Sequence, residues 1–172
     1  CALVKHPLEN EITIIDIGQG DSILLRDWQG RTILIDTGGK VEFGQTEAWR
    51  KRQSSTNAER TLIPYLKSRG IDQIDHLVLT HTDADHMGDM EVVASSLHIK
   101  EVNVSKGSLK KATFVKRLER LKLPVKTVEV GDRFPIFDRF VEVLYPMEVG
   151  DGSNNDSLVL YGYLQGVSFL FT

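Results

Sequence analysis

Hydrophobic and polar positions alternate along the chain in a pattern that predicts strands near both ends and mixed helices and strands between them. Period-two alternation and short apolar runs predict strands, which cover residues 11–17, 22–26, 32–35, 77–79, 101–104, 125–130, 140–144, 157–163 and 167–171. Apolar positions spaced three and four apart predict helices over 58–69, 89–96 and 112–121. This order of elements fits an α/β sandwich, in which two sheets pack together and helices cover them outside.

The apolar run 77–79 ends abruptly at a group of polar side chains. Four potential metal ligands follow it within six residues: His81, Asp83, Asp85 and His86. They lie after a strand and before a helix, where open α/β sheets place their sites. Carboxylates this close repel one another unless a cation neutralises them. The cluster therefore predicts a site for one or two metal ions. The alternative is a polar loop in which Asp83 or Asp85 caps the next helix, but a cap requires one such residue rather than four.

The spacing inside the cluster predicts how its side chains point. His81 and Asp83 are two residues apart, so in an extended loop they point the same way. Asp85 and His86 are adjacent and are expected to diverge, so that they serve a second ion or the far side of the first. His76, five residues before the cluster, is expected to be structural.

The sequence of the cluster resembles a known family signature. H-T-D-A-D-H at 81–86 resembles the H-x-H-x-D-H motif of the metallo-β-lactamase fold hydrolases, with Asp83 in place of the middle His. The H-x-D-x-D-H variant is similar to that of the ComEC competence proteins, which take up DNA through the membrane. Three further segments resemble that subgroup: D-I-G-Q-G-D-S at 16–22, I-L-I-D-T-G-G at 33–39 and N-N-D-S-L-V-L at 154–160. The resemblance covers nearly the whole chain, and it implies an αββα sandwich that is incomplete at the C-terminus.

The resemblance also implies roles for individual residues. Its metal ligands are His81, Asp83, Asp85 and His86, and its catalytic candidates are Asp85 and Asp36. Asp36, at the end of the strand 32–35, would orient ligands by hydrogen bonds rather than bind metal. Where the fold usually supplies a further His, this chain offers neutral groups, which are weak ligands. These groups and one turn residue are candidates for substrate binding: Asn154, Asn155, Ser157 and Gln19.

The ligand set predicts the metal and the reaction. Replacing a His ligand by Asp83 makes the site harder, which favours Mn²⁺, with Zn²⁺ or Mg²⁺ as alternatives. Such ions lower the pKa of water and polarise an acceptor oxygen. The ComEC resemblance implies a DNA phosphodiesterase that degrades one strand while the other enters the cell during competence. The alternatives are a degenerate hydrolase fold that binds DNA or assembles the uptake channel, and a small-molecule metallo-hydrolase.

Length and composition set the context. A chain of 172 residues with 41% hydrophobic content predicts a single domain, spanning 1–172. No apolar run approaches the roughly 20 residues that a membrane helix requires. The chain begins at Cys1, without an initiator Met, and ends at Thr172, after which the family usually continues with Gly-Asp. We therefore expect a fragment of a larger membrane protein that lacks the Asp bridging both ions and binds metal incompletely.

The resemblance implies the cellular setting as well. The parent protein would lie in the cell membrane with this domain outside the cytoplasm, and its partners would be DNA and the transmembrane channel portion of the same polypeptide. No nucleotide cofactor is expected, and the oligomeric state is not predicted.

Net charge is −3, which argues against a uniformly basic surface but leaves room for a local basic track. Cations gather between residues 106 and 126 against a single acid, Glu119: Lys106, Lys110, Lys111, Lys116, Arg117, Arg120, Lys122 and Lys126. This run suits either binding to a phosphate backbone or a solvated helix face.

A polar stretch over 40–57 predicts a long loop near the site, where Trp49 would stack on a base or anchor the loop.

Overall fold

The computed structural model describes residues 8–40 and 55–172. Cys1, Trp49 and most of the expected loop over 40–57 lie outside the described residues. The strands are β1 (Glu11–Asp16), β2 (Asp21–Arg26), β3 (Thr32–Ile35), β4 (Gln73–Val78), β5 (His98–Ser105), β6 (Val125–Val128), β7 (Arg133–Ile136), β8 (Arg139–Tyr145), β9 (Val159–Leu164) and β10 (Val167–Phe171). The helices are α2 (Ile63–Ser68), α3 (Ala84–Met87), α4 (Met90–Ser96) and α5 (Ala112–Leu121), and a helical turn over Ala58–Leu62 leads into α2.

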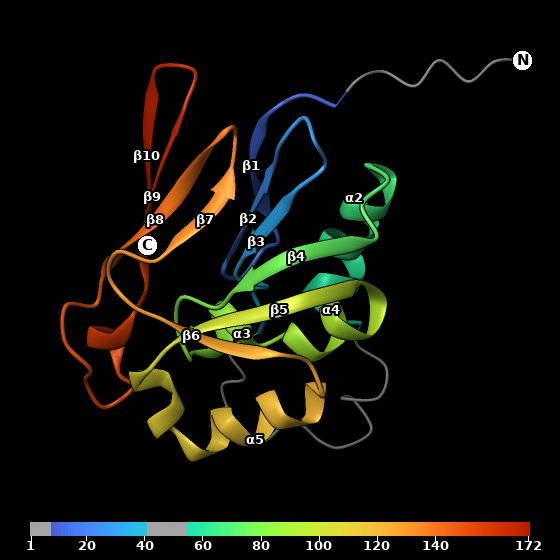
Figure 1. Ribbon diagram of the computed structural model, residues 1–172. Coiled ribbons are helices and arrows are strands. Elements are labelled where there is room, and N and C mark those ends of the chain that lie inside the picture. Colours follow the sequence, from blue (N-terminus) through green and yellow to red (C-terminus); the bar gives the residue numbers. More distant parts are fainter. Residues whose placement is uncertain (1–7, 41–54) are drawn as a thin grey trace, which may run out of the picture.

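Two sheets form the sandwich. Strands β1 to β6 lie in sequence order in a six-stranded sheet, and β10, β9, β8 and β7 form a four-stranded antiparallel sheet. Helices α2, α4 and α5 cover one side of the six-stranded sheet, and the smaller sheet lies on its other side (Figure 1). The mixed α/β sandwich expected from the sequence is thus confirmed, and the described residues supply three of the four layers of an αββα arrangement.

Strand polarity changes within the six-stranded sheet. The pairs β1–β2 and β2–β3 are antiparallel, whereas β3–β4, β4–β5 and β5–β6 are parallel. Parallel strands need a crossover, and helices supply these connections here. The C-terminal ends of β3 and β4 therefore lie side by side, at the edge of the sheet where its parallel strands end. The chain leaves both strands toward α3 (Figure 1). This edge carries the predicted cluster.

Each layer boundary has its own hydrophobic core. One cluster packs the helices against the six-stranded sheet and includes Leu34, Leu77 and Phe114. The other lies between the sheets and includes Ile33, Val78 and Leu160. Successive residues of a strand point to opposite faces, so Ile33 and Leu34, like Leu77 and Val78, serve the two cores from one strand. A strand buried on both faces reads as a continuous apolar run, which is the pattern at 77–79.

Two elements differ from the sequence-based expectation. Strand β7 was not predicted, because it contains Pro135 and lies at the edge of its sheet, where a proline is tolerated. The cluster was predicted to lie on a loop, but Ala84 to Met87 form the short helix α3 before α4 begins.

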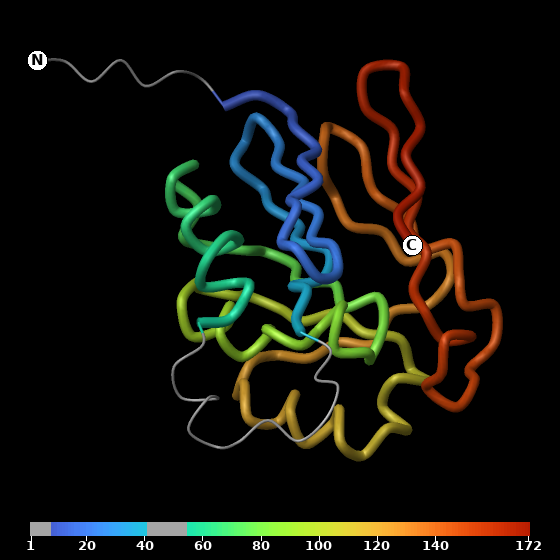
Figure 2. The backbone as a smooth tube through the Cα atoms, turned by 180° about the vertical axis from the view of Figure 1, so that it is seen from behind, coloured from blue at the N-terminus to red at the C-terminus, as the bar shows by residue number. Residues whose placement is uncertain are grey.

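Seen from behind, the β9–β10 hairpin stands at the opposite side of the molecule from α2 (Figure 2). No helix in the described ranges has the length and hydropathy needed to cross a membrane.

We expect Leu77→Ala to lower the free energy of unfolding by about 2–5 kcal/mol, because it leaves a cavity in the helix-side core. Leu77 is fully buried in a central strand, whereas Leu170 on β10 is 61% exposed. The matched control Leu170→Ala should change stability by less than about 0.5 kcal/mol. Urea unfolding of both variants measures the difference. Equal losses would show that this core does not carry the stability of the fold.

Candidate metal centre

Asp36 connects the strand ends that meet at this edge. Its buried carboxylate accepts hydrogen bonds from the Thr80 backbone N–H at 2.7 Å, from the Thr80 hydroxyl and from Nδ1 of His86 at 2.9 Å. Its own carbonyl accepts a bond of 2.7 Å from the Ser22 hydroxyl. One residue thereby joins β2, β3, the segment after β4 and α3. Asp36 adopts φ = 60°, a conformation that is uncommon outside glycine and that concentrates at functional sites.

Asp36 and His86 also shift each other's protonation. Burial raises the pKa of Asp36 above its ordinary value of 3.8, and the bonds from His86 and Thr80 oppose this rise. The hydrogen bond to Asp36 raises the pKa of His86 above 6.5, and burial opposes it. A carboxylate on one imidazole nitrogen fixes the orientation of the ring and leaves the other nitrogen to bind an ion. Nδ1 of His86 is engaged, so its Nε2 is the available ligand atom.

Asp85 lies on the Nε2 side of His86. One of its carboxylate oxygens is 3.9 Å from Nε2, and the Asp85 side chain is 42% exposed. The expectation that these two adjacent residues diverge is therefore wrong. They sit on α3 rather than on an extended loop, and the helical backbone brings the carboxylate back toward the imidazole.

His81 and Asp83 form a second pair. Nδ1 of His81 is 3.3 Å from an Asp83 carboxylate oxygen, so they point the same way, as their spacing predicts. Asp83 is the N-cap residue of α3, yet its side chain makes no capping hydrogen bond. The alternative in which Asp83 is an ordinary helix cap is therefore wrong. The imidazole rings of His81 and His86 meet edge to face with centroids 5.3 Å apart, which places the two pairs next to each other.

Three glycines let neighbouring chain segments close around this loop. A Cβ on Gly20 would lie 1.7 Å from the carbonyl oxygen of Asp85, and one on Gly39 would lie 2.2 Å from that of Ala84. A Cβ on Gly88 would lie 2.3 Å from the same Ala84 oxygen. Such distances are far below van der Waals contact, so only glycine fits at these positions. The turn before β2 and the turn after β3 thus both pack on the backbone of the cluster.

Of the four substrate-binding candidates, Asn154 reaches the cluster. Its side-chain oxygen lies 2.7 Å from Nε2 of His81. Gln19 is exposed, and its carbonyl accepts a 3.5 Å bond from the Gly39 N–H. Asn155 lines a separate depression with Met147 and Gly150. The Ser157 N–H donates to the carbonyl of Asn154, which helps to shape that loop. The binding roles of all four residues stay predictions.

Sequence reasoning missed the residue that holds the Asn154 loop. Asp156 is 1% exposed, and its carboxylate accepts hydrogen bonds from the backbone N–H of Gly150, at 2.6 Å, and of Gly152. An acid within a Gly-rich loop is the only signal in the sequence. Asp89 is a second acid that holds a backbone segment in place. It is buried and accepts a 2.8 Å bond from the Ala58 N–H, so it fixes the turn that leads into α2.

The cations of the basic run differ in their contacts. Arg117 on α5 bonds both Glu91, at 2.6 Å, and the Gly88 carbonyl, at 2.7 Å, so it ties the outer helix to the cluster loop. Lys106 pairs with Glu129 at 2.8 Å. Lys111 donates to the Thr82 hydroxyl at 2.8 Å, which places it beside the cluster. The run is therefore partly structural.

The types of side chain in the cluster fit a divalent cation. They are arranged as two pairs, His81 with Asp83 and Asp85 with His86. Two imidazoles and two carboxylates suit a hard or borderline ion. Within residues 8–40 and 55–172, no three His, Cys, Asp or Glu side chains already converge on one point. Asp83 and Asp85 are 55% and 42% exposed, so both carboxylates are able to turn toward an ion. The metal-ligand roles stay predictions.

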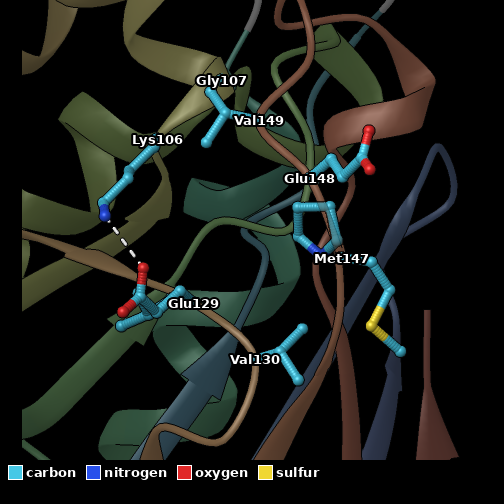
Figure 3. A pocket seen from close by; sticks show the side chains of 9 residues that line it. Lys106, Gly107, Glu129, Val130, Met147, Glu148 and Val149 are labelled. Carbon is cyan, nitrogen blue, oxygen red and sulfur yellow. Dashed lines mark hydrogen bonds and ion pairs between the residues drawn. The ribbon is translucent and has the colours of Figure 1, made fainter.

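A cavity of about 180 Å³ is lined by residues of the segments 106–107, 128–130 and 146–149. Apolar side chains and the Lys106–Glu129 pair form its walls, with Val130, Met147 and Val149 around it (Figure 3). None of the four metal-ligand candidates lines this cavity. It is therefore separate from the cluster.

We expect Gly20→Ala to disturb the cluster and Gly18→Ala to leave it intact. Both glycines have positive φ, 73° and 87°, so both variants should lose about 1–2 kcal/mol of stability. A Cβ at Gly18 meets nothing within 4 Å, whereas one at Gly20 would collide with Asp85. Only Gly20→Ala should therefore also weaken Mn²⁺ binding. Urea unfolding and Mn²⁺ titration of both variants check this, and equal metal affinities would contradict it.

Comparison with known proteins agrees with this geometry. The family model described as the metallo-beta-lactamase superfamily matches residues 15–172. The ComE operon protein 3 of Bacillus subtilis (strain 168) is 36% identical over 170 residues, which are 95% of this chain and 22% of that protein. Competence protein ComA of Neisseria gonorrhoeae is 37% identical over 87 residues, 49% of this chain and 10% of that protein. The chain thus spans about a fifth or less of the curated relatives it matches.

A solved structure supports the fold. The subclass B3 metallo-beta-lactamase MEM-A1, isolated from a soil metagenome library, superposes with a TM-score of 0.57 at 14% identity. The match covers 95% of this chain and 61% of that one, and at this identity it speaks for the fold alone. The family model, by contrast, covers most of the sequence. This chain therefore belongs to the metallo-beta-lactamase superfamily.

Proposed function

We propose that this domain is a metal-dependent phosphodiesterase that cleaves DNA during natural competence. The observation that carries the proposal is the cluster itself, in which a buried Asp36 orients His86 beside Asp85 while His81 and Asp83 form a second pair. The similarity to two competence proteins supports DNA as the substrate. Degradation of the strand that does not enter the cell is the role proposed in that setting.

His81, Asp83, Asp85 and His86 would hold one or two divalent ions, with Mn²⁺ preferred because two of the four ligands are carboxylates. A bound ion supplies activation of water and polarisation of a phosphoryl oxygen. The protein supplies orientation. Asp36 holds His86 so that Nε2 faces Asp85, and Thr80 holds Asp36 through two hydrogen bonds.

Asn154 contributes a neutral group at the edge of the centre. Its amide oxygen faces His81, and its NH₂ group would donate to a substrate oxygen. We propose that Asn154 positions the phosphodiester, with Asn155, Ser157 and Gln19 as further substrate contacts. Asp156 holds the loop that carries Asn154 through its hydrogen bond with the Gly150 N–H.

A binding module is the second candidate. The engagement of His81 by Asn154 and the pairing of ligands, rather than their convergence, favour it. The hydrogen bond between Asp36 and His86 favours the enzyme, because a carboxylate commonly orients an imidazole that ligates a metal ion in this way.

We further propose that the 172 residues form one domain of a longer membrane protein with this domain outside the cytoplasm. Its partners would be DNA and the transmembrane channel portion of the same polypeptide. The small share of the curated relatives that the chain covers supports this view.

The direct test is Mn²⁺-dependent cleavage of labelled single- and double-stranded DNA by this chain and by its longer parent. Asp85→Asn should abolish cleavage, because it removes a charged ligand at nearly constant volume, and EDTA should do the same. Asp138→Asn, a change of the same kind in the turn between β7 and β8, is the control and should retain cleavage. DNA binding without cleavage by either form, and without bound metal, would replace the enzyme with the binding module.

We expect Asp36→Asn to weaken Mn²⁺ binding about 10- to 100-fold and to change its pH dependence. An ion must displace the proton of His86, so affinity rises with pH until His86 is neutral. Asp36 raises the pKa of His86 above 6.5, which moves this rise to higher pH. Without the charge of Asp36, the midpoint should move to lower pH.

Mn²⁺ titrations at several pH values around neutrality, monitored by electron paramagnetic resonance, measure both the affinity and the pH midpoint of binding. Asp75→Asn is the matched control, because Asp75 pairs with Lys100 at 2.7 Å elsewhere on the same sheet. This control should keep the midpoint of the original protein. An unchanged midpoint in Asp36→Asn would show that Asp36 does not govern the protonation of His86.

A further inference from the structure

Lys111 places a cation directly beside the centre. It is the residue before α5, and its ammonium donates to the Thr82 hydroxyl at 2.8 Å. The same nitrogen lies 3.9 Å from a carboxylate oxygen of Asp83. Thr82 and Asp83 belong to the cluster loop, whereas Lys111 comes from a different part of the chain. The fold therefore brings a positive charge to the rim of the predicted metal site.

The position of Lys111 is fixed by its surroundings. A Cβ on Gly152 would lie 3.0 Å from Cγ of Lys111 and 2.8 Å from the carbonyl oxygen of Gly107, so the lysine stem runs against a glycine. The Thr82 hydroxyl, which accepts from Lys111, donates in turn to the Gly152 carbonyl at 3.3 Å. A chain of polar contacts thus joins Lys111, the cluster loop and the loop that carries Asn154.

These contacts are with neutral groups, so they do not neutralise the charge of Lys111. Arg117 and Lys106 in the same basic run each have a carboxylate within hydrogen-bond distance. Among the described residues, the ion pair of Lys111 is with Asp83 at 3.9 Å, beyond ordinary hydrogen-bond distance, and Asp83 is itself a metal-ligand candidate. An ammonium has three donors, and the Thr82 hydroxyl takes one. Its side chain is 37% exposed, so part of it is open to solvent.

We propose that Lys111 binds a non-bridging oxygen of the phosphodiester at the metal centre, between the His81–Asp83 pair and the Asn154 loop. This inference rests on the proposed function and names the group that recognises the negative charge of the substrate. Binding metal through Asp83 draws the carboxylate charge toward the ion, which leaves the ammonium for an anionic ligand. Lys111 and Asn154 then contact the same phosphate.

The test compares Lys111→Met, which keeps the stem and removes the charge, with Lys111→Arg, which restores a cation. Lys67→Met on α2 is the control for the loss of one exposed positive charge. All are made in whichever form of the protein cleaves DNA. We expect Lys111→Met to lower kcat/KM for DNA about 10- to 100-fold. The slope of log affinity for single-stranded DNA against log salt should fall by about 0.7. Lys111→Arg should recover part of the loss, and Lys67→Met should change neither quantity.

Mn²⁺ affinity separates substrate binding from a purely structural role. Removing a cation 3.9 Å from Asp83 should leave Mn²⁺ affinity unchanged or increase it, because the repulsion between lysine and metal is gone. If Lys111 only held the two loops together, Lys111→Met would weaken Mn²⁺ binding together with activity. That outcome, or full activity in Lys111→Met, overturns the inference while leaving the nuclease intact.

The contact between Lys111 and phosphate can be tested even if the protein does not cleave DNA. Binding of a short single-stranded phosphorothioate oligonucleotide, measured by fluorescence anisotropy, should weaken in Lys111→Met and remain in Lys67→Met. In that case the nuclease fails and the phosphate contact stands. If the original protein binds no oligonucleotide with or without Mn²⁺, both the proposed function and this inference are overturned.

Discussion

The structure of the centre depends on one buried carboxylate. Asp36 directly follows β3, and its hydrogen bonds reach Thr80, shortly after β4, and the imidazole on α3. A buried acid is costly unless its charge is compensated, and here two donors of Thr80 and one of His86 compensate it. Without these bonds, the Asp36 carboxylate would no longer link the segment after β4 to the imidazole of His86, although the Asp36 N–H would still donate to the Val78 carbonyl. The positive φ of Asp36 is tolerated because these contacts determine its position.

Close approach of backbones is the second constraint. Gly20 and Gly39 come from separate turns, and each meets the backbone of residues 84–85 at a distance that excludes any side chain. The segments 16–22 and 33–39 are therefore packing motifs as well as sequence signatures. They set the space in which the ligand side chains stand, and they explain physically why glycine occurs at these positions.

The sequence predicted the sandwich and the location of the cluster, because both leave local signals. Apolar runs mark the central strands, and four potential ligands within six residues mark the cluster. It did not predict β7, where Pro135 removes a strand signal, nor the convergence of Asp85 and His86, which depends on a four-residue helix. Asp89, Lys111 and Asp156 were missed as individuals for another reason. Their roles come from partners far away in the chain, and an acid or a lysine alone looks like surface.

The contacts of the centre join residues that are far apart in sequence. Asp36 and Thr80 are 44 residues apart, Asp36 and His86 are 50, and His81 and Asn154 are 73. Contacts of this kind form only after the chain between them is ordered, because closing a long loop costs entropy before the contact is gained. The arrangement of the centre is therefore a property of the folded domain rather than of any single segment. In an unfolded chain, the 81–86 segment lacks both the carboxylate of Asp36 and the amide of Asn154.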